Sequence, residues 1–164
     1  MAIKVHNSVS QSTIALLSYG SVEGITYRLT SCTVFAWYLA HGLDATPLNP
    51  SSSSISVRSQ SYSTIPSPSS LETPSDYSLS VITPPKVTRK LLQEARKVGI
   101  RAVWLQPGTF DDEILQYVRN EWPDAHLAGF HDPPGTEAHD GWCVLVEGEK
   151  GMKLAALRDT VERL

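Results

Sequence analysis

The stretch that decides the fold is IRAVWLQPG, residues 100–108. Its apolar run, residues 102–105, follows a helix-like segment and leads into a tight turn, after which an acidic segment opens another helix. This order of helix, buried strand, turn and helix is typical of a parallel α/β sheet. Ligands of such sheets bind at the carboxyl ends of the strands, so we expect Gln106, Pro107 and Gly108 to border a binding site.

The same alternation of strands and helices extends along most of the chain. It predicts a single α/β domain with a mainly parallel sheet of five or six strands and helices on both faces. Because parallel crossovers are right-handed, a Rossmann-like doubly wound arrangement is the simplest topology. Strands are expected at residues 13–17, 44–48, 77–82, 102–105, 126–130 and 142–146, and helices at residues 33–41, 86–98, 110–122 and 152–164. The expected layout is a polar leader (1–11), the domain itself (12–150) and a C-terminal helix (151–164).

Residues 51–75 are rich in Ser and Pro, a composition typical of flexible linkers. Apolar residues recur within this stretch, however, and can anchor it to the surface of the domain. Ser67 or Ser70 can cap one helical turn there. The stretch is therefore interpreted as a long, partly ordered connection and not as a domain boundary.

Charge and composition narrow the classes of function. The 164 residues fit one domain with a real core, and the formal net charge of −3, without a Lys/Arg cluster, argues against a nucleic-acid partner. No apolar run approaches the roughly 20 residues that span a bilayer, so no membrane partner is expected. The two cysteines, Cys32 and Cys143, are too few for a disulfide framework, and no convincing secretory signal is present. These features favour a cytoplasmic protein, with a mitochondrial presequence as the open alternative, and they indicate no oligomeric state.

Three proline-containing turns that follow predicted strands carry the functional hypothesis. Each places a rigid backbone and a small polar side chain at the same edge of the sheet, where backbone amides can meet phosphate or amide oxygens. For any single turn, the alternative is that proline merely ends the strand. Three such turns at successive strand ends favour a ligand cleft. The turns are Asn49-Pro50, Thr83-Pro84-Pro85 and Gln106-Pro107-Gly108.

Other reactive residues give weaker signals. His131, Asp132, His139 and Asp140 share one Pro/Gly-rich loop but lack the helical His pair or the cysteine pair of most zinc sites, so no metal is expected. Cys143 lies in an apolar run and is interpreted as a packed core thiol. No nucleophile elbow, P-loop or paired-carboxylate signature appears, which favours a binding protein over an enzyme.

Four segments resemble the small CoA-binding proteins, which are stand-alone Rossmann-type domains similar to the CoA-binding part of succinyl-CoA synthetase. The segments are residues 46–50, 79–85, 99–108 and 142–147, the last of which resembles the family's final strand. The resemblance covers about residues 34–148, and its central motif, residues 99–108, is the most specific part. It implies that the ligand is coenzyme A, a small-molecule partner bound along the carboxyl edge of the sheet.

The resemblance also implies where each part of coenzyme A lies. The first turn would border the nucleotide, the second would face the adenine, ribose or diphosphate, and the third would lie near the pantetheine arm. The residues so placed are Asn49 and Pro50; Thr83, Pro84 and Pro85; and Gln106, Pro107 and Gly108.

One loop departs from the family pattern. The family's first strand normally runs into a Gly-Ala-Ser turn that presents amides and a helix dipole to the diphosphate. Here the corresponding stretch is residues 18–33, in which Gly20, Ser21 and Gly24 can supply a substitute turn, whereas Glu23 would repel a phosphate. Gly20 and Ser21 are therefore included among the candidate ligand residues.

The leading hypothesis is a non-catalytic module that binds coenzyme A or an acyl-CoA. Lys86, Arg89 and Lys90, at the start of the helix after the second turn, are candidates for binding the ribose 3′-phosphate. An NAD(P)-binding redox protein is the first alternative. An intact Gly-rich loop and an acidic residue at the end of the second strand would favour it, but neither is present, and the second strand ends at Asn49. A degenerate domain that binds a protein partner is the second alternative.

Overall fold

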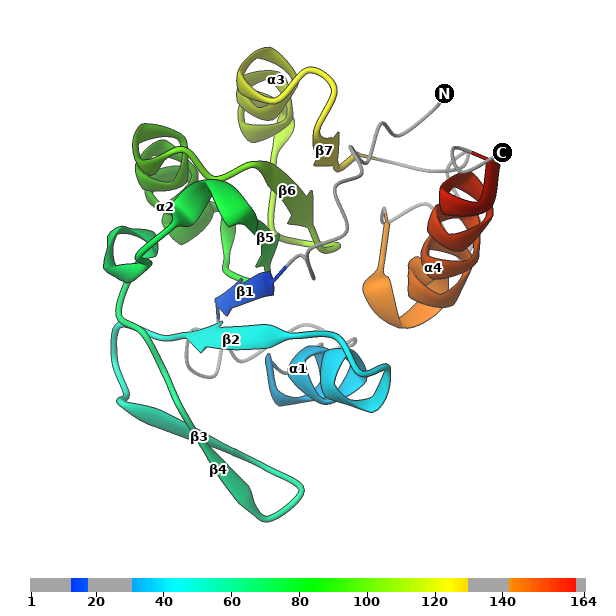
Figure 1. Ribbon diagram of the computed structural model, residues 1–164. Coiled ribbons are helices and arrows are strands. Elements are labelled where there is room, and N and C mark those ends of the chain that lie inside the picture. The colour runs from blue at the N-terminus through cyan, green and yellow to red at the C-terminus, as the bar shows by residue number, and fades with distance from the viewer. Residues whose placement is uncertain (1–12, 18–30, 130–141, 162–164) are drawn as a thin grey trace.

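A five-stranded parallel sheet forms the centre of the computed structural model, which describes residues 13–17, 31–129 and 142–161 (Figure 1). All four hydrogen-bonded neighbour pairs in this sheet are parallel, so the carboxyl ends of the strands meet at one edge. The prediction of a single α/β domain with a parallel sheet is confirmed. The strands, in spatial order, are β2 (Ala45–Leu48), β1 (Thr13–Leu17), β5 (Tyr77–Val81), β6 (Ala102–Leu105) and β7 (His126–Leu127).

Helices cover both faces of the sheet (Figure 1). One face packs against α2 (Pro85–Val98) and α3 (Asp112–Glu121), whose buried residues join one hydrophobic cluster with the sheet. The other face packs against α1 (Ser31–Ala40) and the start of α4 (Val144–Val161), which form a second cluster. The helices expected at residues 33–41, 86–98 and 110–122 are therefore confirmed, with boundaries shifted by one or two residues.

The central strand β6 contributes side chains to both hydrophobic clusters. Val103 and Leu105 are buried in the cluster with α2 and α3, whereas Trp104 packs into the cluster with α1 and α4. Side chains alternate between the faces of a strand, so a strand that is covered on both sides reads as a continuous apolar run. This is the physical reason that residues 102–105 were recognisable in the sequence.

The helix α1 is apolar around its whole circumference because other elements cover it on several sides. Val34 and Tyr38 are almost completely buried, and the ring of Phe35 meets that of Tyr62 edge-on at 5.0 Å. The indole of Trp37 packs against Gly148 of α4. These aromatic residues therefore belong to the core of the chain.

The connection at residues 51–75 is more ordered than its composition suggests. It contains an antiparallel hairpin of β3 (Ser54–Val57) and β4 (Gln60–Ser63) that projects beyond the sheet (Figure 1), followed by the short 3-10 helices η1 (Pro68–Ser70) and η2 (Pro74–Asp76). Ser67 occupies the N-cap position of η1, one of the two serines proposed for it, although its side chain makes no capping hydrogen bond. The two turn residues of the hairpin, Arg58 and Ser59, have φ values of 49° and 66°, which favour Gly or Asn. The missing turn signal explains why the sequence did not indicate a hairpin.

The final strand predicted at residues 142–146 is wrong. Residues 144–146 form the first turn of α4, so the C-terminal helix begins at Val144 and not at residue 151 or 152. Val144 and Gly148, one turn apart, are buried, whereas Val146 is 73 % exposed. A short apolar run does not distinguish a buried strand from a helix, and here the helical spacing matches the buried face. Among the described residues, no helix is both long and apolar enough to cross a membrane.

Candidate functional site

The three proline-containing turns lie at the carboxyl edge of the parallel sheet. They follow β2, β5 and β6, and the parallel register brings the ends of these strands to one side of the molecule. The fourth candidate segment, with Gly20 and Ser21, follows β1 and lies outside the described residues. The topology therefore brings together the turns that the sequence singled out, as far as the structure describes them.

The turn after β2 is held by the chain segment that follows the hairpin. The Asn49 amide donates to the Ile65 carbonyl at 2.8 Å, and the Ile65 amide donates to the Pro47 carbonyl at 3.0 Å. The Asn49 side chain accepts a hydrogen bond from the Ser51 amide at 2.9 Å, which closes an Asx turn. The Asn49 carboxamide oxygen is thus engaged in shaping the loop.

A surface hollow of about 350 Å³ lies beside this turn. Its lining consists of hydroxyl, amide and proline groups and includes no Lys or Arg. Such a surface suits a neutral polar part of a ligand, such as a sugar or a nucleobase edge, better than a phosphate. The lining residues are Asn49, Pro50, Ser51, Ser52, Ser53, Thr64 and Pro66.

The turn after β5 is fixed by two buried threonines. The Thr88 hydroxyl donates to the Thr83 carbonyl at 2.8 Å, and the two hydroxyl oxygens lie 2.8 Å apart. Since the Thr88 proton points to the carbonyl, the Thr83 hydroxyl donates to Thr88. Pro84 and Pro85 then open α2 without a side-chain cap, and the described residues provide no partner for the Lys86 amide. The first turn of α2 therefore presents a backbone donor and the positive end of the helix dipole.

The turn after β6 is organised by Gln106, whose side chain is fully buried. Its carboxamide oxygen accepts from the Val144 amide at 2.8 Å, and its nitrogen donates to the Ser80 hydroxyl at 3.3 Å. Gln106 thus connects β5, β6 and the start of α4. A ligand at this turn would meet the exposed backbone of Gly108, which has a φ of 81°, more readily than the Gln106 carboxamide.

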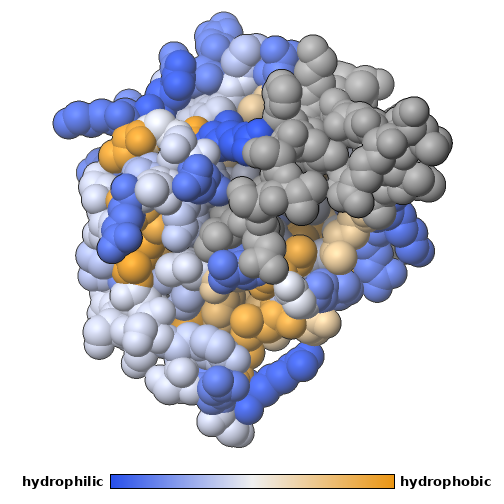
Figure 2. Space-filling view, in the orientation of Figure 1, coloured by the Kyte–Doolittle hydropathy of each residue, from blue (hydrophilic) through white to orange (hydrophobic). Residues whose placement is uncertain are grey.

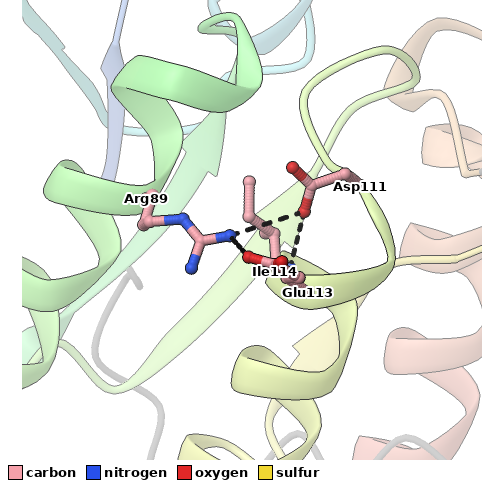
Figure 3. Close-up of polar contacts among 4 residues, drawn as sticks. All are labelled: Arg89, Asp111, Glu113 and Ile114. Carbon is pink, nitrogen blue, oxygen red and sulfur yellow. Dashed lines mark hydrogen bonds and ion pairs between the residues drawn. The ribbon is translucent and has the colours of Figure 1, made fainter.

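Cationic side chains on α2 differ in how they are engaged. Arg89 forms an ion pair with Glu113 of α3 and lies 3.9 Å from Asp111, which also caps α3 by accepting from the Ile114 amide (Figure 3). Lys86 and Lys90 are exposed, one helical turn apart, and form no ion pair with the described residues. The part of the surface that lies over α2 and α3 in the orientation of Figure 1 is mainly hydrophilic, with small hydrophobic areas (Figure 2). Of the three candidate cations, the two lysines are therefore the ones available to a phosphate.

Comparison with known protein families identifies the family of this chain. Residues 28–147 match the CoA binding domain. The chain belongs to this CoA binding domain family. The match includes all three described turns, and it confirms the family resemblance seen in the sequence.

Solved structures show the same fold as this CoA binding domain. A conserved hypothetical protein from Pyrococcus furiosus superposes with a TM-score of 0.53 at 23% identity, over 70% of this chain and 90% of that one. A hypothetical protein from Pyrococcus horikoshii OT3 gives 0.53 at 22% identity, over 68% of this chain and 72% of its own. A protein from Thermus thermophilus superposes with a TM-score of 0.52 at 22% identity, over 71% of this chain and 81% of its own. A comparison with curated protein sequences gives no significant match.

Several polar residues of the CoA binding domain were not identified from sequence because their role depends on contacts across the sheet. Thr88, Ser80 and Tyr38 are almost completely buried beside the turns or beneath them. The Tyr38 hydroxyl makes no well-formed hydrogen bond with the described residues. Burial raises the pKa of Tyr38 to about 12, an effect that the nearby Ser80 hydroxyl reduces and that Cys143 reinforces.

The environment of Cys143 differs from the prediction. It is a free, half-buried thiol directly before α4, and its carbonyl accepts from the Val146 and Glu147 amides, so it is not the core thiol of a strand. The described residues contain no cluster of three or more metal-ligating side chains. The loop with His131, Asp132, His139 and Asp140 lies outside them.

Proposed function

We propose that this chain is a binding module for coenzyme A or an acyl-CoA, with no catalytic machinery of its own, built on a Rossmann-like doubly wound sheet. The observation that carries the proposal is the family match over residues 28–147, which includes the three turns at the carboxyl edge of the sheet. Helices on both faces and ligand-facing turns at the carboxyl edge are the features on which nucleotide binding in doubly wound sheets depends.

The chemistry of the edge supports a specific orientation of the ligand. The neutral hollow beside Asn49 and Pro50 suits the adenosine part, because it offers hydroxyl and amide groups without a cation. The start of α2, at Pro84, Pro85 and Lys86, offers an amide and a helix dipole to the diphosphate. The pantetheine arm would then continue toward the turn after β6.

The two lysines of α2 that form no ion pair within the described part of the chain support recognition of the 3′-phosphate. Lys86 and Lys90 are exposed near the start of α2, at the same edge as the hollow. Arg89 is a weaker candidate than the sequence suggested, because two carboxylates of α3 already surround its guanidinium. A phosphate is recognised well by lysine as a point charge, so the lysines suffice for this role.

Calorimetric titration tests the proposal directly. We expect coenzyme A and acetyl-CoA to bind, dephospho-CoA to bind more weakly, and NAD and NADP not to bind. Binding of NAD or NADP with an affinity equal to that of coenzyme A would replace the proposal with a redox function. Lack of binding by all five compounds would favour a degenerate domain that has kept the fold alone.

A further inference from the structure

A single carboxylate of α2 accepts the polar contacts of the short helix η1. The Ser69 hydroxyl donates to Glu94 Oε1 at 2.6 Å, and the Ser69 amide donates to the same oxygen at 3.2 Å. The Ser67 hydroxyl adds a third contact to this carboxylate. Partial burial tends to raise the pKa of Glu94, but these hydrogen bonds and the nearby Lys97 outweigh it and lower the pKa below its usual value. Glu94 is therefore charged and acts as the acceptor of the whole contact.

The short helix η1 directly follows one wall of the hollow. The segment directly before it contributes Thr64 and Pro66 to the lining, and Ile65 pairs with Leu48 at the edge of the sheet. Within η1, Pro68 is buried, whereas Ser69 is exposed. The wall is thus continuous with a helix whose polar contact to α2 lies at the surface.

Ser69 also has the local sequence of a substrate for acid-directed serine kinases. Ser69 is an exposed residue, and the exposed residue Glu72 follows three positions later, with Asp76 further along. A kinase whose substrate groove is basic reads such downstream carboxylates by charge. The segment around Ser69 is a surface loop with short 3-10 turns, which offers less resistance to local opening than a strand or a long helix.

We propose that Ser69 is a phosphorylation site for an acid-directed protein serine kinase, and that its phosphorylation releases η1 from α2. The Ser69 oxygen attacks the γ-phosphorus of ATP, so that an O–P bond forms, ADP leaves, and the hydroxyl proton passes to the kinase base. The product replaces a hydroxyl donor with a dianion that faces the charged Glu94. Repulsion between like charges then replaces the hydrogen bond that holds η1.

The modification itself is tested on the purified full-length chain with an acid-directed kinase and ATP. We expect one phosphate on Ser69, located by fragmentation mass spectrometry, and none in a Ser69→Ala variant. Stoichiometric phosphorylation elsewhere with Ser69 untouched would overturn the proposed site.

The release of η1 is tested with charge variants that need no kinase. Ser69→Glu should speed hydrogen exchange at the Ser70 and Leu71 amides, which close η1, by roughly tenfold. Ser70→Glu is the matched control, because it adds the same charge one residue away, where no contact to Glu94 exists among the described residues. The double variant Ser69→Glu/Glu94→Lys should restore slow exchange by pairing opposite charges. Equal exchange in the Ser69→Glu and Ser70→Glu variants, or no restoration in the double variant, would refute the release.

A consequence for the ligand rests on the proposed function. Release of η1 should loosen the wall at Thr64 and Pro66, so Ser69→Glu should weaken coenzyme A several-fold and the double variant should recover it. Hydrogen exchange reports the release whether or not coenzyme A binds. If coenzyme A does not bind, the proposed function is wrong, but the kinase and hydrogen-exchange experiments still test the proposal for Ser69. The failure of one proposal is therefore distinguishable from the failure of the other.

Discussion

At the scale of single residues, Gln106 shows how a side chain placed at a ligand edge can have a structural task. Its carboxamide pairs with the Val144 amide and the Ser80 hydroxyl in a fully buried position. Replacement by Leu leaves both partners without a hydrogen bond, so Gln106→Leu should destabilise the chain by about 1–3 kcal/mol. Urea unfolding measures this loss, with Gln116→Leu on the exposed face of α3 as a control near zero. An unchanged stability of Gln106→Leu would show that Val144 and Ser80 find other partners.

Lys86 is the residue at which recognition of the 3′-phosphate can be separated from binding in general. Lys86→Glu should weaken coenzyme A by about tenfold and dephospho-CoA by much less, because only the former carries the 3′-phosphate. Lys97→Glu makes the same charge change near the other end of α2 and should affect neither ligand strongly. Parallel titrations of both ligands measure the difference, and equal losses for the two would exclude this role.

Tyr38 gives the chain a pH dependence in the alkaline range. Burial raises the pKa of its phenol from 10.0 to about 12. The raised value means that the folded state retains the proton while the unfolded state loses it, so stability is lost as the pH rises above about 10. The loss between pH 9 and pH 11 should be roughly 1 kcal/mol. Urea unfolding of wild type and Tyr38→Phe over this range measures it, since the Phe variant lacks this component; parallel curves would contradict the assignment.

At the scale of elements, the contact between α1 and α4 depends on the absence of a side chain at Gly148. A Cβ there would lie 2.4 Å from the Trp37 ring, which is itself stacked on His41 at a centroid distance of 4.0 Å. Gly148→Ala should therefore destabilise the chain by about 1–3 kcal/mol through overpacking, despite its better helix propensity. Gly151→Ala lies in the same helix with open space around its Cβ and should stabilise by up to about 1 kcal/mol. Thermal unfolding of both variants compares the signs, and a stabilised Gly148→Ala would show that the helices separate easily.

Element types followed from sequence where the pattern had one interpretation. The strand at residues 102–105 and the helix α2 carry clear periodicity, and the turn residue Gly99, with φ of 88°, ends α2 as Gly commonly does. The prediction for the start of α4 was wrong because its apolar run fits a strand and a helix equally well. The hairpin was not predicted because its turn residues, Arg58 and Ser59, adopt positive φ values although neither is the Gly or Asn typical of such a turn.

At the scale of the whole molecule, the common edge of the three proline-containing turns was more predictable than their contacts. Parallel strands must end at one edge, so Asn49, Thr83 and Gln106 could be brought together from strand order alone. The availability of their polar atoms to a ligand depends on neighbours such as Thr88 and Val144. No local sequence pattern predicts these contacts.

Binding of coenzyme A should leave a footprint confined to the carboxyl edge. We expect slower hydrogen exchange at residues 49–53, 64–66 and 83–86 in the presence of saturating coenzyme A, because these segments line the hollow or open α2. The tip of the hairpin at Arg58 and Ser59 should exchange at an unchanged rate and serves as an internal control. Protection concentrated at the hairpin would place the ligand elsewhere.

The pairing of Ile65 with β2 has a consequence for how the chain behaves at high concentration. An edge strand with free backbone groups can recruit the edge of another molecule and start aggregation. Here Pro47 has no amide hydrogen to offer, and its carbonyl and the Asn49 amide are already satisfied by Ile65. At the opposite border, β7 has only two residues, His126 and Leu127. Both borders of the sheet therefore offer little template for adding a foreign strand, which protects the chain against intermolecular β-stacking.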